Sequence, residues 1–257
     1  MPTSSLNLRR LEEISQNASR AERGLMIDGW NVGLSPGLAK RSRCVNAFYP
    51  SARPFAENLA AARAAYAAVR LPCIFRITPF VANATLDADL AAHGFLHFET
   101  TLVQVLRLAD LQLDHLQPVD ITVRAQPDRA QAAAWVGAMR GDSASETAAL
   151  AARWTHCAAR IDPSFAYDAA GHCVARLVAI SEEGHVGIFD VGTPEAHRKH
   201  GYASALLAHQ LRAARDAGAH TAYLQVEPDN TSRRIYERFG FRTAYDYGYR
   251  ALPGDAR

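Results

Sequence analysis

Hydrophobic and polar positions follow two spacings along the chain, and each predicts a different element. Apolar residues three or four apart, or alanine-rich stretches without breakers, predict helices at about 54–70, 85–93, 128–139, 143–160, 201–216 and 231–239. An amphipathic helical arm within 1–23, starting near Ser5, is predicted to precede them. Short runs rich in β-branched and aromatic residues predict strands at about 24–34, 73–77, 101–106, 121–124, 165–167, 173–180, 185–193 and 222–226. This mixture predicts an α/β (α+β) fold.

A leucine-rich connector that ends near Gln117-Pro118 divides the chain. We therefore expect a helical arm at 1–23, an N-terminal half at 24–112 and a second domain at 119–257. The segment Leu90–Phe95 resembles Tyr236–Phe241, because each reads as a helix that ends in Gly-Phe and leads into a strand. The similarity indicates two related halves, although glycine is common after any helix and the match can also arise by chance.

Composition limits the classes of protein. The chain has 257 residues, 49% of them hydrophobic, which suffices for one large core or two modest ones. Its four cysteines are scattered and form no C-x-x-C pair, so we expect reduced thiols and no metal site. No stretch approaches the roughly 18 apolar residues of a membrane span, and no leader pattern is recognised. We expect a cytoplasmic protein that does not bind membranes.

Charge is unevenly distributed. Residues 195–257 hold 10 Lys/Arg against 7 Asp/Glu, a net charge of +3, whereas residues 1–194 hold 18 against 19, a net charge of −1. The C-terminal part is suited to a compact anion, and a solvated helical surface would explain the same excess. The basic segment Lys40–Arg43 lacks interleaved aromatic residues, and overall basicity is weak, so we expect no nucleic-acid partner.

The strand at 185–193 leads through a polar turn into the helix that starts near Gly201. A helix start presents unpaired backbone N–H groups and a partial positive charge, which favours phosphate. Gly201 allows close approach, and Arg198 and Lys199 add positive charge. The segment lacks the Gly-Lys-Ser/Thr of a Walker loop and the three glycines of a Rossmann fingerprint. An ordinary strand-to-helix loop remains the alternative.

The motifs in their order carry a family resemblance. The loop Arg198–Ala203 is followed by a strand, by Asn230, by Tyr236 and by Gly240-Phe241. From about Ile121 to Arg250 the sequence resembles the GNAT superfamily of acyl-CoA N-acetyltransferases, and the N-terminal half resembles the divergent extra domain of two-part bacterial members. The resemblance implies a GNAT fold, with a mixed, mostly antiparallel twisted sheet flanked by helices in two tandem halves. It also implies acetyl-CoA as co-substrate.

The resemblance also implies which residues bind the co-substrate. The backbone of Val191 and Thr193, with Gly192 between them, would pair with the pantetheine arm, and Asn230 would lie beside it. The pyrophosphate would be bound by the loop, which comprises Arg198, Lys199, His200, Gly201, Tyr202 and Ala203. Ala203 replaces the usual second glycine. Lys199-His200 replaces a glycine-containing pair, which predicts a less free backbone.

Acyl transfer to an amine requires a proton for the departing thiolate and removal of a proton from the amine. Tyr236 suits the first role, because a phenol with a pKa of about 10 is protonated at neutral pH; packing beside Phe239 and Phe241 is its alternative role. Asp190 and Glu227 are the candidate bases, although either can be a structural carboxylate and the amine can lose its proton to water. Asn230 can also cap the following helix.

The proposed repeat assigns one co-substrate site to the chain. At an offset of 146 residues, Tyr236 aligns with Leu90 and the loop aligns with Ala52–Glu57, which has no glycine. We expect the N-terminal half to shape the acceptor pocket or to cover a sheet edge. The predicted function is N-acetyl transfer to a primary amine of a small molecule or protein, by a monomer or homodimer. A non-catalytic acyl-CoA-binding sensor or structural module is the alternative.

Overall fold

The computed structural model describes residues 6–256, which form two compact units. The larger unit comprises the chain up to Ala18 and Val103–Ala244, and the smaller unit comprises Ser19–Leu102 and the chain from Tyr245. Strands β5 (Leu96–Arg107) and β11 (Arg242–Ala251) contribute residues to both. The units interleave along the chain, whereas the predicted domains at 1–23, 24–112 and 119–257 are consecutive, and those bounds stay predictions.

The smaller unit contains a sheet and two helices, α2 (Phe55–Ala68) and α3 (Leu86–Ala92). Its strands β1 (Gly24–Ile27), β2 (Trp30–Gly33), β3 (Val45–Ala47) and β4 (Ile74–Ile77) lie in the order β1-β2-β3-β4-β11. The segment predicted as one strand at 24–34 is a hairpin, which closes on Asp28-Gly29, where both residues have positive φ (42° and 89°), as a tight right-twisted hairpin requires. Trp30 and Phe95 each contact the ring of Phe75 edge-on in the core.

The larger unit contains β6 (Thr122–Ala125), β7 (Arg160–Tyr167), β8 (Cys173–Glu182), β9 (His185–Gly192) and β10 (Thr221–Val226), in the order β10-β9-β8-β7-β6. Neighbouring strands are antiparallel except β9 and β10, which are parallel. The helices of this unit are α1 (Leu8–Ala18), α4 (Arg129–Arg140), α5 (Ala144–His156), α6 (Tyr202–Asp216) and α7 (Arg233–Phe239).

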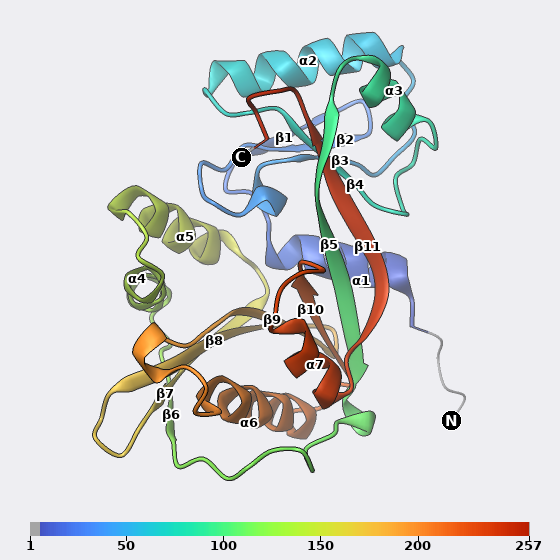
Figure 1. Ribbon diagram of the computed structural model, residues 1–257. Coiled ribbons are helices and arrows are strands. Elements are labelled where there is room, and N and C mark those ends of the chain that lie inside the picture. The colour runs from blue at the N-terminus through green and yellow to red at the C-terminus, as the bar shows by residue number, and fades with distance from the viewer. Residues whose placement is uncertain (1–5, 257) are drawn as a thin grey trace. The chain divides into compact units, whose positions relative to one another are not determined.

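Helices cover both faces of this sheet (Figure 1). Phe165 and Val178 pack with Trp154 in the core beneath α4 and α5. The preceding residue on β7, Ser164, points to the opposite face, where its hydroxyl donates to the side chain of Gln210 on α6 at 3.3 Å. Because side chains alternate along a strand, α4 and α5 lie on one face and α6 on the other.

Side chains cap the starts of α4 and α5. The carboxylate of Asp128 accepts the N–H groups of Ala130 and Gln131, and Ser143 and Glu146 form a complete capping box. The predicted end of the second helix at Arg160 is wrong. The guanidinium of Arg129 binds the carbonyls of Trp154, Cys157 and Ala159, which ends α5 at His156, and strand β7 begins at Arg160.

The two Gly-Phe segments have the same local structure. The N–H of Phe95 donates to the carbonyl of Leu90 (3.0 Å), and the N–H of Phe241 donates to the carbonyl of Tyr236 (3.2 Å). The glycine before each phenylalanine has a positive φ (83° and 103°), and both phenylalanines are buried. In this type of helix C-terminus a glycine with left-handed φ reverses the chain direction, and the following N–H groups bind the last free carbonyls of the helix.

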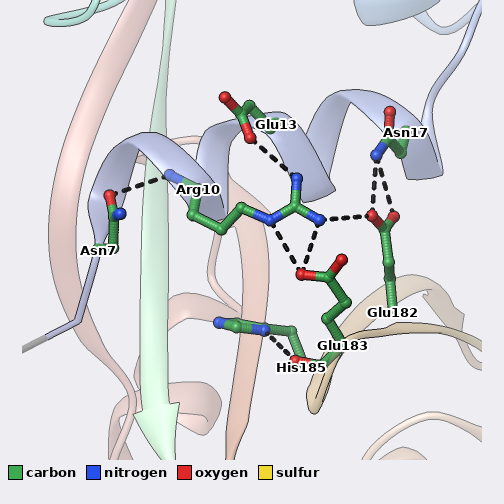
Figure 2. Close-up of polar contacts among 7 residues, drawn as sticks. All are labelled: Asn7, Arg10, Glu13, Asn17, Glu182, Glu183 and His185. Carbon is green, nitrogen blue, oxygen red and sulfur yellow. Dashed lines mark hydrogen bonds and ion pairs between the residues drawn. The ribbon is translucent and has the colours of Figure 1, made fainter. Parts of the chain in front are cut away.

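The N-terminal helix α1 spans Leu8–Ala18, within the arm predicted to start near Ser5, which lies outside the described residues. Two of its apolar residues, Leu11 and Ile14, are fully buried. The polar side of the helix is bound to the turn between β8 and β9 (Figure 2). Arg10 forms ion pairs with Glu182 (3.1 Å) and Glu183 (2.8 Å) there.

These two kinds of contact differ in energy, which gives a first prediction. We expect Leu11→Ala to lower the free energy of unfolding by roughly 2–5 kcal/mol, because it leaves a cavity under the helix. Arg10→Ala is expected to cost at most about 1 kcal/mol, because its ion pairs are solvent-exposed. Urea unfolding of both variants measures the difference. A larger loss for Arg10→Ala would show that charge rather than burial attaches the helix.

Candidate functional site

Strands β9 and β10 separate at one end. Their parallel ladder runs from the pair Thr221 and His185 to the pair Leu224 and Ile188. Strand β9 then continues as far as Gly192, four residues beyond the last pair. The strand therefore offers backbone N–H and C=O groups toward the opening, where an extended ligand can add to the ladder.

A β-bulge causes this separation. In the β8–β9 ladder Val178 pairs with Phe189, whereas the next pair joins Arg176 to Gly192. Two residues of β9, Asp190 and Val191, thus stand opposite one residue of β8. Asp190 has φ 50°, in the left-handed region. An extra residue bends its strand and increases the local twist, which turns the end of β9 away from its parallel neighbour.

The loop after β9 presents its backbone to the same end of the sheet. Gly201 stands at the N-cap of α6 with φ 81°, and no side chain of the described residues caps that helix start. Lys199 also has a positive φ, 68°. Left-handed residues of this kind turn successive N–H groups toward one point, which suits an anion. The sequence Lys199-His200 predicts a less free loop backbone. Lys199 nevertheless adopts the left-handed conformation that glycine takes easily.

The side chains of the loop are exposed. Arg198, Lys199 and His200 are all open to solvent. The Nε of Arg198 donates to the carbonyl of Thr193 at 3.4 Å, which holds that guanidinium near the end of β9. Tyr202 and Ala203, in the first turn of α6, are half-buried. The positive groups of the predicted phosphate loop thus lie beside an uncapped helix start.

The second group of predicted residues follows β10. The side-chain oxygen of Asn230 accepts the N–H of Ser232 at 2.9 Å in a turn. Helix α7 therefore begins at Arg233 rather than at the predicted Thr231. Tyr236 is half-buried in this helix, with its ring 6.2 Å from that of Phe241. Burial raises the pKa of Tyr236 to about 12, so the phenol holds its proton at neutral pH.

The two candidate bases stand in different surroundings. Asp190 accepts a hydrogen bond from Arg140 at 2.8 Å, and its side chain is 19% exposed. Glu227 is exposed just beyond the end of β10. The carboxylate of Asp190 is thus bound to a guanidinium, whereas that of Glu227 is open to solvent. Because β9 and β10 are parallel neighbours, the residues that follow both strands lie at one edge of the sheet.

Sequence reasoning missed Arg140 and Arg176, which lie against the bulge. Arg140, the last residue of α4, also pairs with Asp142 at 2.6 Å. The guanidinium of Arg176 lies against Gly192, where an added Cβ would stand 2.5–2.7 Å from three of its atoms. Only a residue without a side chain leaves room for it. Arg140 is 50 residues from Asp190 in the sequence, and Arg176 lies on a different strand from Gly192, so no linear spacing indicates either contact with the bulge.

In the smaller unit, a side chain of the protein itself binds the backbone N–H groups at the start of a helix. The carboxylate of Asp28 accepts the N–H groups of Ala52 (3.1 Å) and Arg53 (2.9 Å) and the side-chain amide of Asn58 (2.8 Å), just before and within α2. The hydrogen bond from Asn58 and those from the backbone lower the pKa of Asp28 to about 2. An aspartate of the chain thus occupies the segment that aligns with the phosphate loop.

Residues 6–256 lack two further features. No group of three or more His, Cys, Asp or Glu side chains in this range is arranged to hold a metal ion. None of the helices in the same range is both long enough and apolar enough to cross a membrane.

Comparisons with known proteins give one family match. A sequence model of the acetyltransferase (GNAT) family matches residues 130–241, which include the phosphate loop, Asn230 and Tyr236. A comparison with curated protein sequences gives no match.

Solved structures show the same fold. A GCN5-related N-acetyltransferase from Kribbella flavida is 20% identical, with a TM-score of 0.70 over 98% of this chain and 97% of its own. A functionally unknown conserved protein from Staphylococcus epidermidis is 16% identical, with a TM-score of 0.62 over 88% of this chain and 91% of its own. A tandem GNAT protein from the clavulanic acid biosynthesis pathway is 15% identical, with a TM-score of 0.59 over 80% of this chain and 73% of its own.

The predicted fold class, a mixed and mostly antiparallel sheet flanked by helices in tandem GNAT-like halves, is confirmed. Residues 130–241 thus match the acetyltransferase (GNAT) family, and the fold of the chain is that of the GNAT proteins.

Proposed function

We propose that the protein transfers an acetyl group from acetyl-CoA to a primary amine by direct attack, with Tyr236 as the general acid. The observation that carries this proposal is the opening between β9 and β10 beside the uncapped start of α6. The backbone of Val191 and Thr193 would pair with the pantetheine arm at that opening. The loop Arg198–Ala203 would bind the pyrophosphate with its N–H groups and two cations.

In the proposed reaction the amine nitrogen attacks the thioester carbonyl, and the carbon–sulfur bond breaks. The departing thiolate takes the phenolic proton of Tyr236, and the resulting phenolate recovers a proton from solvent. The raised pKa of Tyr236 supports the donor role, because the group is fully protonated wherever the amine is partly neutral. Asn230 would lie beside the pantetheine while its side chain holds the turn before α7.

For removal of the amine proton we favour Glu227 or water over Asp190. The carboxylate of Asp190 is occupied by its ion pair with Arg140, whereas Glu227 is exposed beside the end of β10. Asp190 is then a positioning residue that shapes the bulge. The alternative function, a non-catalytic acyl-CoA sensor, uses the same binding loop but needs no proton donor.

Substitution of Tyr236 separates these two functions. We expect Tyr236→Phe to lower kcat at least about 100-fold for acetyl transfer, because it removes the proton donor and keeps the ring. Release of free CoA thiol from acetyl-CoA with a panel of primary amines measures this. Tyr49→Phe, at a tyrosine 64% exposed in the smaller unit, is the control and should match the wild type.

Thermal stabilisation by CoA without turnover of any amine would support the sensor and contradict the enzyme. Absence of stabilisation and of measurable CoA binding would contradict the proposed co-substrate itself.

The pH dependence follows from the pKa of Tyr236. Because burial raises that pKa to about 12, the tyrosine stays protonated through the alkaline range of an assay. We expect kcat/KM to rise with pH as the amine loses its proton, near pH 10, and to show no fall below about pH 11. Rates measured between pH 7 and 10.5 test this, and a decline with a midpoint near 10 would contradict the assignment.

The two glycines that flank α6 offer a matched test of the proposed phosphate loop. Gly201 precedes the helix and Gly218 follows it, and both have left-handed φ (81° and 92°). Alanine at either position should cost about 1–2 kcal/mol of stability. We expect Gly201→Ala alone to weaken CoA binding, because its Cβ would also stand 3.1 Å from Val119 and disturb the loop. Calorimetric titration with CoA measures this; equal affinities would contradict the assigned phosphate site.

A further inference from the structure

Two arginines lie against the bulge of β9, and their surroundings differ. Arg140 forms ion pairs with Asp142 at 2.6 Å and with Asp190 at 2.8 Å. Its Nε also donates to Asp142 at 3.1 Å. One guanidinium thus engages both neighbouring carboxylates.

Arg176 has no such partner. The residue is only 9% exposed, and its Nε is fully buried without a hydrogen bond. Within residues 6–256 no carboxylate oxygen lies within 4.0 Å of its nitrogens, and its side chain makes no hydrogen bond. Burial lowers the pKa of this guanidinium, although the nearby Asp190 opposes the shift. A buried cation without an anionic partner strongly destabilises the folded protein, and a bound anion would neutralise it.

The position of Arg176 links it to the proposed reaction. Its guanidinium lies against Gly192, the residue between Val191 and Thr193, which would hold the pantetheine arm. On β8 it shares a face with Val178, and thus the side of the sheet covered by α4 and α5. The phosphates of CoA are assigned to the loop before α6, so Arg176 is available for another anionic group.

We propose that Arg176 binds a carboxylate carried by one of the two substrates. A planar guanidinium matches a carboxylate through two parallel hydrogen bonds, which is its strongest common pairing. The carboxylate belongs either to the amine acceptor, as in an amino acid, or to the acyl group of the thioester, as in a dicarboxylic acyl-CoA. This inference rests on the proposed function and specifies the substrate class of the same site.

The kinetic test uses Arg176→Met, which removes the charge and keeps an unbranched side chain. Acceptors are amino acids and the corresponding amines without the carboxylate, each with acetyl-CoA and with succinyl-CoA. We expect the wild type to prefer a carboxylate in one of these two arms, which identifies its source. For that substrate Arg176→Met should lower kcat/KM about 10- to 100-fold, mainly through KM.

The uncharged substrate pair should be affected less than about twofold by Arg176→Met, since it makes no charge-assisted hydrogen bond there. Arg160→Met is the matched control, because Arg160 is 73% exposed on the neighbouring strand β7 and pairs with Asp162. It should match the wild type in all arms. An equal loss for charged and uncharged substrates in Arg176→Met, or no loss, would overturn the proposal.

A second measurement needs no turnover. Without ligand, Arg176→Met should unfold at a higher temperature than the wild type, because it removes an unpaired buried charge. Succinate should raise the unfolding midpoint of the wild type and leave that of the variant unchanged. A less stable variant that responds to succinate like the wild type would overturn carboxylate binding. If no amine is acetylated, the proposed function fails, and this measurement still decides on the carboxylate.

Discussion

The ion pair between Arg140 and Asp190 is the interaction on which the candidate site depends. Asp190 has the left-handed φ of the bulge, which costs a residue with a side chain on the order of 1–3 kcal/mol. Its carboxylate is bound by the last residue of α4, so the packing of that helix holds the bulge in place. The bulge turns the end of β9 from β10, and without it the two strands would continue their ladder and close the opening.

The local signals of the sequence predicted most elements and the helix start near Gly201, because these depend on residues close together in the chain. Gly201, Asp128 and the Ser143 capping box act within one turn of a helix, so their spacing is sufficient evidence. The end of α5 could not be predicted in this way. It is set by Arg129, a residue of another helix, which takes the last carbonyls of α5.

The polar cluster at the bulge could not be predicted from the sequence for the same reason. Arg140, Arg176 and Asp190 come from a helix and two strands, and no periodicity connects them. The bulge itself has no marker, since the left-handed residue is an aspartate rather than a glycine. Asp190 was selected as a candidate base from its place at a strand end, and its environment, which the sequence does not contain, favours a positioning role.

The two units differ in whether a side chain binds the N–H groups at a helix start. This difference supports the proposed co-substrate site in the larger unit. Backbone N–H groups before and within a helix start favour an anion in both. In the smaller unit Asp28 supplies that anion from the chain itself. In the larger unit no side chain of the described residues caps α6, and Arg176 has no carboxylate partner within residues 6–256. An uncapped helix start and an unpaired buried arginine both make the fold less stable than it could be, and under the proposals above the phosphates of CoA and a substrate carboxylate would remove both costs.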